Sequence, residues 1–193
     1  MKRLARLAVS LVLFGSFGSL AQRACASTDT VHIDIHVSIS ASKSLQALTT
    51  YYDFGALPVS STTVSASSIT IRNDSGALVE SYLLYAGDAI SQGGGTNWTL
   101  AGSPSSDHYQ LDAVFGSTQP ALNDGNWTLG NLSYTPTNCS DDAHFGNNVS
   151  GESCYQISPL GSAKDRQLWF RMKTPTAVTS PNEHIAVVNI SVQ

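Results

Sequence analysis

The most constraining feature of this 193-residue sequence is a strict two-residue alternation in its N-terminal part. Between positions 31 and 40, β-branched apolar residues alternate with polar ones, so one side of an extended chain is apolar and the other is polar. Because successive side chains of a strand point to opposite faces of a sheet, this pattern predicts a strand with one side buried. The apolar positions are Val31, Ile33, Ile35, Val37 and Ile39.

Further short apolar segments follow at the spacing typical of an all-β fold, and none has a convincing helical period. We therefore expect one domain, residues 27–193, built as an antiparallel Ig-like β-sandwich of about seven to nine strands. Residues 116–165 are rich in Gly, Asn, Pro and Ser and are expected to form a long irregular insertion. The expected strands lie at residues 48–54, 68–72, 78–86, 98–100, 109–115, 167–173 and 185–192, with short extended pieces at 127–129 and 155–157.

Residues 1–26 have the order of a secretory signal peptide. Lys2, Arg3 and Arg6 precede an apolar run over residues 7–20, and Ala-Cys-Ala at 24–26 offers a cleavage site. The run is shorter than a membrane-spanning helix requires. The sequence thus predicts a cleaved signal, no membrane insertion after cleavage, and a protein that is secreted to the cell surface, the extracellular space or the periplasm.

Two cysteines remain after the expected cleavage, Cys139 and Cys154. An even pair in an oxidising compartment predicts a disulfide that staples the insertion. A zinc site or a nucleophilic thiol is the alternative. Zinc needs two further ligands at short spacing, and only His144 lies between the two cysteines.

The charge balance excludes some classes of partner. Beyond residue 26, six basic side chains stand against fourteen acidic ones, a formal charge of −8. Nucleic acids and anionic membranes both attract clusters of Lys and Arg, which this composition does not supply. The expected partners are therefore other copies of the chain or other surface proteins, with glycans as the alternative.

Two groups of side chains have the chemistry of metal ligands. His32 and His36 share the polar face of the first strand, but positions i and i+4 of a strand lie about 13 Å apart, too far to bind one ion. Oxygen ligands gather inside the predicted disulfide loop, where calcium binding is the alternative to an ordinary polar loop. These candidate calcium ligands are Asp141, Asp142, Asn147 and Glu152.

The tetrapeptide Asn-Trp-Thr-Leu occurs twice and places tryptophans at Trp98 and Trp127. Exposed aromatic rings can stack against sugar rings, whereas buried ones supply much of the core of small β domains. The two tryptophans are therefore either a candidate ligand-binding platform or two core residues.

Seven Asn-x-Ser/Thr sequons occur in the sequence. In a eukaryotic secretory pathway several would be glycosylated, whereas in a bacterium they are turn residues that precede Thr-rich strands. Both interpretations stay open at this point. The sequons begin at Asn73, Asn97, Asn126, Asn131, Asn138, Asn148 and Asn189.

Two segments resemble bacterial secreted Ig-like surface proteins. Tyr-Asp-Phe-Gly at 52–55, a Ser/Thr-rich spacer and Ile-Thr-Ile-Arg-Asn at 69–73 resemble the opening of such domains. Residues 168–175 are similar to a late strand of these proteins, and the repeated Trp-Thr-Leu resembles the motif of WxL cell-wall-binding domains. The resemblance implies a secreted structural β-sandwich and transfers no active site.

Together these features predict an exported, non-enzymatic structural protein without a resident cofactor. No Gly-x-Ser-x-Gly, His-Glu-x-x-His or P-loop signature is present. The strands at 31–39 and 185–192 are nearly free of the Lys and Pro that protect sheet edges, so they either pair in their own domain or add to a neighbouring subunit. The sequence thus favours an appendage, fibre or coat subunit, and the alternative is a carbohydrate- or calcium-dependent adhesive module.

Overall fold

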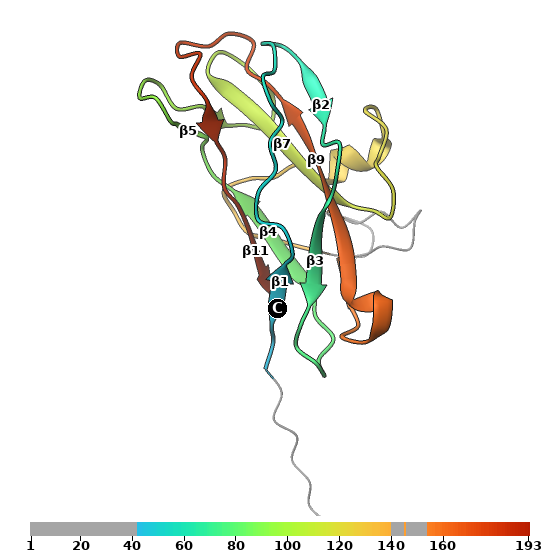
Figure 1. Ribbon diagram of the computed structural model, residues 1–193. Helices are drawn as coiled ribbons and strands as arrows, with labels where there is room; N and C mark the ends of the chain where they lie inside the picture. The colour runs from blue at the N-terminus through green and yellow to red at the C-terminus, as the bar shows by residue number, and fades with distance from the viewer. Residues whose placement is uncertain (1–41, 140–144, 146–153) are drawn as a thin grey trace, which may run out of the picture. The chain divides into compact units, whose positions relative to one another are not determined.

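Short strands joined by turns make up almost all of the regular structure. The computed structural model describes residues 42–139, 145 and 154–193 (Figure 1). In these ranges the only helices are η1 (Gly125–Leu129) and η2 (Gly161–Lys164), and no helix is long and apolar enough to cross a membrane. The all-β class is confirmed. Its strands are β1 (Leu45–Ala47), β2 (Thr62–Val64), β3 (Ile69–Asn73), β4 (Tyr82–Ala86), β5 (Ile90–Ser91), β6 (Thr99–Leu100), β7 (His108–Phe115), β8 (Thr137–Asn138), β9 (Asp165–Lys173), β10 (His184–Ile185) and β11 (Val188–Val192).

The strands form two main sheets. The larger sheet has the order β1-β3-β9-β7-β6, and β2 pairs with β9 beyond the end of β3. It is curled like half a barrel, and all its pairs are antiparallel except that between β6 and β7. The smaller sheet has the order β11-β4-β8, and β5 pairs with β10. Each of these pairs is antiparallel.

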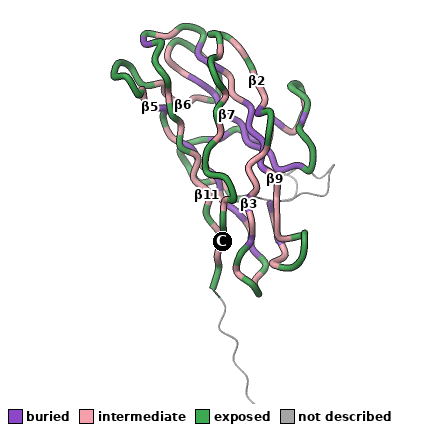
Figure 2. The backbone as a smooth tube through the Cα atoms, in the orientation of Figure 1, coloured by how far each residue is buried: buried purple, intermediate pink, exposed green. Residues whose placement is uncertain are grey.

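The main hydrophobic core is shared by the two sheets. In β4 the side chains of Tyr82, Leu84 and Ala86 are buried and the two between them are only half-buried, the pattern of a strand with one apolar face. Figure 2 shows that buried residues also follow β7 and β9 in the larger sheet. The same cluster contains Ile71, Tyr109, Leu111, Ala113, Phe115, Leu168 and Phe170 from that sheet.

A second, smaller core covers the outer side of the larger sheet. Trp127 of η1 packs there against Val114 and Trp169, so β7 is buried on both faces. Gly130 follows the last residue of the helix, and a Cβ added to it would lie 2.3 Å from the carbonyl oxygen of Ala113. Only glycine allows the chain to approach β7 this closely.

The observed elements correct several sequence expectations. Residues 127–129 belong to η1 rather than to an extended piece, because Asp124 caps this turn by accepting a hydrogen bond from the backbone N–H of Asn126. The expected strand at 48–54 is also wrong: β1 ends at Ala47, and an irregular segment follows in which Asp53 accepts a hydrogen bond from the backbone N–H of Gly55. Strands β2, β5 and β8 were not expected. The predicted strand at 31–40 lies outside the described residues.

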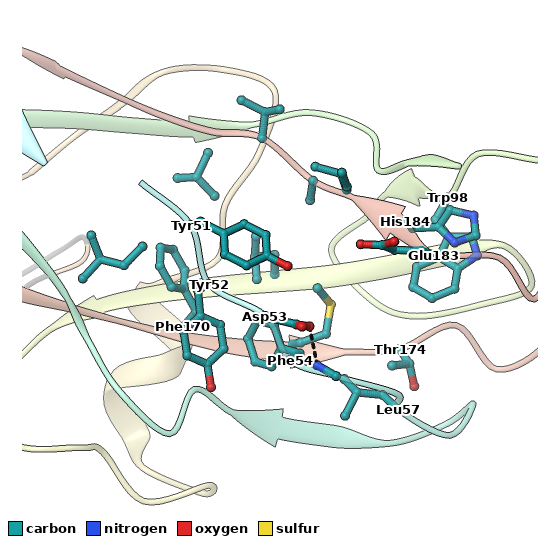
Figure 3. A pocket seen from close by; sticks show the side chains of 18 of the residues that line it. Tyr51, Tyr52, Asp53, Phe54, Leu57, Trp98, Phe170, Thr174, Glu183 and His184 are labelled. Atoms are coloured by element: carbon teal, nitrogen blue, oxygen red, sulfur yellow. Dashed lines mark hydrogen bonds between the residues drawn. The ribbon is translucent and has the colours of Figure 1, made fainter. Parts of the chain in front are cut away.

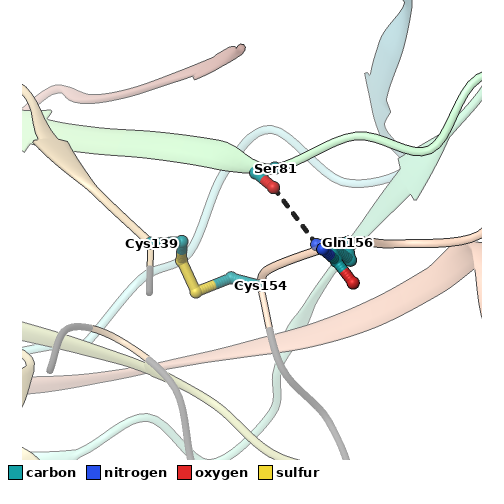
Figure 4. Close-up of a disulfide and its surroundings, with 4 residues drawn as sticks. All are labelled: Ser81, Cys139, Cys154 and Gln156. Carbon is teal, nitrogen blue, oxygen red and sulfur yellow. Dashed lines mark hydrogen bonds between the residues drawn. A yellow bond between two sulfur atoms is a disulfide. The ribbon is translucent and has the colours of Figure 1, made fainter. Parts of the chain in front are cut away.

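The predicted disulfide between Cys139 and Cys154 is confirmed, with a Cα–Cα distance of 5.6 Å (Figure 4). Both cysteines are buried, and their backbones bond to the same residue of β4. The N–H of Cys139 donates to the carbonyl of Tyr82, whose own N–H donates to the carbonyl of Cys154. The disulfide therefore attaches both ends of the loop to the smaller sheet.

We expect replacement of both cysteines with alanine to lower the free energy of unfolding by about 3 kcal/mol, because the bridge closes a loop of 15 residues. Urea unfolding monitored by tryptophan fluorescence would measure the loss. The unmodified protein under reducing conditions is the control and should lose a similar amount. An unchanged urea midpoint in both samples would contradict the prediction.

Candidate functional site

A groove of about 1150 Å³ opens between β1 and β11 (Figure 3), and we call it the edge groove. One wall consists of β1 and the segment that follows it, residues 49–57. The other wall consists of residues 181–190, which include β10 and the first part of β11. The groove thus lies between the edge strand of the larger sheet and the edge strand of the smaller one.

The two walls are strand edges. Within the described ranges, β1 pairs only with β3, and β11 pairs only with β4. Figure 1 shows that the two strands run in opposite directions, β1 away from the end of the domain where Gln193 lies and β11 toward it. An unpaired strand edge presents backbone N–H and C=O groups that can form a ladder with an added strand.

The floor of the edge groove is the main hydrophobic core. Side chains of β3, β7 and β9 that belong to the core, or pack against it, also line the groove. Apolar side chains on the rim are unusually exposed. Tyr51 is 62% exposed and Val187 is 56% exposed. Exposed apolar surface that is continuous with a core marks a binding surface. The floor side chains are Ile69, Ile71, Leu111, Leu168, Phe170 and Met172.

One end of the groove is aromatic and acidic, as Figure 3 shows. The imidazole of His184 stacks on the indole of Trp98, with ring centroids 4.1 Å apart and an interplanar angle of 15°. The Asp53 carboxylate raises the pKa of the Tyr51 hydroxyl above its usual value, with smaller contributions from burial and from the charge of Glu183. Negative charge is therefore concentrated at this end, which we call the acidic end.

The wall near the acidic end is held in place by Asp107. Its carboxylate accepts hydrogen bonds from the backbone N–H and the hydroxyl of Thr179, at 2.7 and 2.5 Å. These bonds hold the pKa of Asp107 below its usual value. They anchor the connection between Pro175 and Pro181 that leads into the groove wall.

The two tryptophans predicted as a ligand-binding platform are not brought together, since they belong to different hydrophobic clusters. Trp98 is half-buried at the acidic end of the groove, whereas Trp127 is completely buried, in agreement with the core interpretation and not with a ligand platform. The predicted strand Val31–Ile39 and the candidate calcium ligands Asp141, Asp142, Asn147 and Glu152 lie outside the described residues. No group of three metal-ligating side chains occurs in the described part of the chain.

The sequons also differ from one another. Asn73 is buried, and its side-chain amide donates to the carbonyls of Leu78 and Ile157, both at 2.8 Å, so this asparagine has a structural role. Asn97, in contrast, is exposed.

Sequence reasoning missed the edge groove. The only sequence signal for it is the presence of apolar residues, such as Tyr51 and Val187, in segments that resemble strands. The structure shows that both side chains remain more than half exposed. Comparisons of the chain with protein-family models, with curated proteins and with solved structures found no match. The function is therefore argued from the groove itself, which offers apolar contacts and two strand edges, the components of β-strand addition.

Proposed function

We propose that the chain is an exported, non-enzymatic structural subunit of a cell-surface or extracellular assembly. Subunits join when the edge groove of one accepts a β-strand from another. The observation that carries this proposal is the position of the main core at the floor of the groove, between two strand edges that have one partner each in the described residues. An added strand would cover the exposed apolar side chains of the rim, such as Tyr51 and Val187, and pair with both edges.

We further infer that the domain is an Ig-like β-sandwich that lacks one strand at the groove. The two sheets that share the main core and the antiparallel pairing support this inference. The disulfide supports export, because such bonds persist mainly in oxidising compartments.

A carbohydrate-binding adhesive module is the second candidate. It is supported by the position of Trp98 at the acidic end of the groove, where aromatic and carboxylate side chains meet. His184 already covers one face of the indole, which leaves less of the ring for a sugar. Strand addition uses the whole length of the groove and is therefore the first proposal.

The test is the size of the secreted protein as a function of its concentration, measured by light scattering and negative-stain microscopy. We expect Val187→Lys to raise the concentration needed for assembly at least tenfold, because Val187 is an apolar, 56% exposed side chain of the groove wall that an added strand would cover, and a charge there would lose contact with water. Leu160→Lys is the matched control, because Leu160 is 68% exposed and does not line the groove.

Assembly by Leu160→Lys and not by Val187→Lys would support the proposal. Two results would contradict the proposal. In one, the unmodified protein stays monomeric at every concentration; in the other, the two variants assemble equally well. In the first of these cases a glycan screen with the Trp98→Ala variant would test the adhesive module.

A further inference from the structure

We infer that the strand accepted by the edge groove is Val31–Ile39 of a second copy of this chain, and that it runs antiparallel to β11. The inference rests on the proposed function, because it identifies the partner of the same groove. It also predicts the form of the assembly, an open head-to-tail row of subunits.

The segment Val31–Ile39 matches the edge formed by β10 and β11 in length, and its alternation of apolar and polar residues suits a strand with one side on the core. The chain from the start of β10 to the end of β11, His184–Val192, has nine residues, as does the segment Val31–Ile39, and nine residues span about 26 Å when fully extended. The apolar side of Val31–Ile39 would face the core at the floor of the groove. Its polar side, with His32 and Asp34, would face solvent.

The first described residues favour a neighbouring copy as the acceptor. Ser44 continues the ladder of β1, because its carbonyl accepts the N–H of Asp74 and its own N–H donates to the buried Glu80 carboxylate at 2.7 Å. Residues 40–44 are Ser-Ala-Ser-Lys-Ser; they include serines, which occur in turns, but lack the Gly, Asn and Asp that adopt the left-handed conformation of the tightest turns and the Pro that starts many of them. An extended chain would place Ile39 about 20 Å beyond Leu45, past the end of its own groove.

Charge decides the direction of the added strand. If the segment runs antiparallel to β11, its C-terminal end and the following Lys43 approach the acidic end of the groove near Asp53 and Glu183. In the opposite direction the acidic residue Asp29 would approach those carboxylates instead. Ladder type does not distinguish the two directions, because β1 and β11 run in opposite directions (Figure 1) and a strand between them pairs antiparallel with one and parallel with the other.

The direction determines how subunits are joined. An extended segment would leave its own domain at the start of β1. When it runs antiparallel to β11, it would enter the groove of the next copy through the acidic end. The acidic end and the start of β1 lie at opposite ends of the groove. The contact then joins two different surfaces and leaves one of each free, so the row stays open. Entry through the same end would instead let two copies exchange segments reciprocally and close as a dimer.

Cysteine crosslinking tests both the segment and its direction. In the antiparallel register His32 would lie opposite Ser191, which alternates with the core-facing Ile190 and Val192, and the two side chains would share the face away from the core. The full chain with His32→Cys and Ser191→Cys should, on mild oxidation, give a ladder of covalent oligomers on a non-reducing denaturing gel. Ser38→Cys with Ser191→Cys would crosslink only if the segment ran the other way, and Ser191→Cys alone is the control.

Each outcome decides the inference. A ladder from the first pair, with the 32–191 linkage identified by mass spectrometry, supports it. Closed dimers from the second pair, or an intramolecular 32–191 bridge, overturn it. If light scattering detects assembly and neither pair crosslinks, another strand occupies the groove, so this inference fails while the proposed function stands. If no assembly forms, the proposed function itself fails.

Discussion

Replacing Arg171 with methionine is expected to lower the free energy of unfolding by about 3–5 kcal/mol, because it leaves a buried carboxylate without its cation. Asp112 in β7 is completely buried, and its Oδ2 lies 2.7 Å from the Nη2 and 2.8 Å from the Nε of Arg171 in β9. The other carboxylate oxygen accepts a hydrogen bond from Gln110 at 2.8 Å. Once the guanidinium is gone, the buried carboxylate loses both of its bonds to Arg171 and keeps the hydrogen bond from Gln110.

The guanidinium also connects the sheet to the segment that covers it. Arg171 donates to the carbonyl of Leu122 at 3.2 Å, and its Cζ lies 5.1 Å from the ring centroid of Trp127. Loss of the side chain therefore weakens both the ion pair and the attachment of the second core.

A second Arg–Asp pair of the larger sheet provides a matched control. Arg72 in β3 and Asp165 in β9 also lie on paired strands, with Nε and Oδ1 2.7 Å apart, but their side chains are 27% and 29% exposed. The hydrogen bond from Arg72 holds the pKa of Asp165 below its usual value, yet water screens this pair. Arg72→Met should cost at most about 1 kcal/mol.

Urea unfolding of both variants would measure the difference between the two ion pairs. The prediction is contradicted if Arg171→Met and Arg72→Met lose equal amounts of stability. A double variant with Asp112→Leu and Arg171→Met should recover much of the loss, since it removes the unpaired buried charge.

The buried ion pair illustrates which parts of the fold a sequence can predict. The strands β7 and β9 were expected from their apolar runs, and the disulfide was expected from the cysteine count. The burial of Asp112 was not expected. The alternation of side chains along a strand indicates which residues share a face of the sheet, but it does not indicate which other segment covers that face. That cover comes from η1, whose position depends on long-range packing of Trp127.

The edge groove escaped prediction for a related physical reason. The groove lies where β1 and β11 have no strand between them in the described residues. The absence of a pairing strand is a property of the whole arrangement of strands, and no single residue indicates it. Tyr51 and Val187 are apolar residues in β-like segments, which predicts burial, yet both are more than half exposed. Apolar residues that remain exposed at an edge become a functional signal only when the structure shows what they border.

The two copies of Asn-Trp-Thr-Leu are expected to respond very differently to the same substitution. Trp127→Ala should lower the free energy of unfolding by about 3–5 kcal/mol, because it removes a large, completely buried side chain. The indole N–H donates to the carbonyl of Ala121 at 2.8 Å, and the ring packs against Val114 and Trp169. The cavity would lie beneath the short helix η1, between it and the larger sheet.

Trp98→Ala should cost less, roughly 1–2 kcal/mol, because this ring is half-buried and contacts solvent at the groove. Its indole Nε1 is buried without a hydrogen-bond partner in the described residues, so truncation breaks no hydrogen bond there. Thermal and urea unfolding of the two variants would measure both losses against the same background. Equal losses would contradict the assignment of Trp127 to the core and Trp98 to the groove. A larger loss at Trp127 would mean that an identical tetrapeptide supports the second core in one place and lines the edge groove in the other.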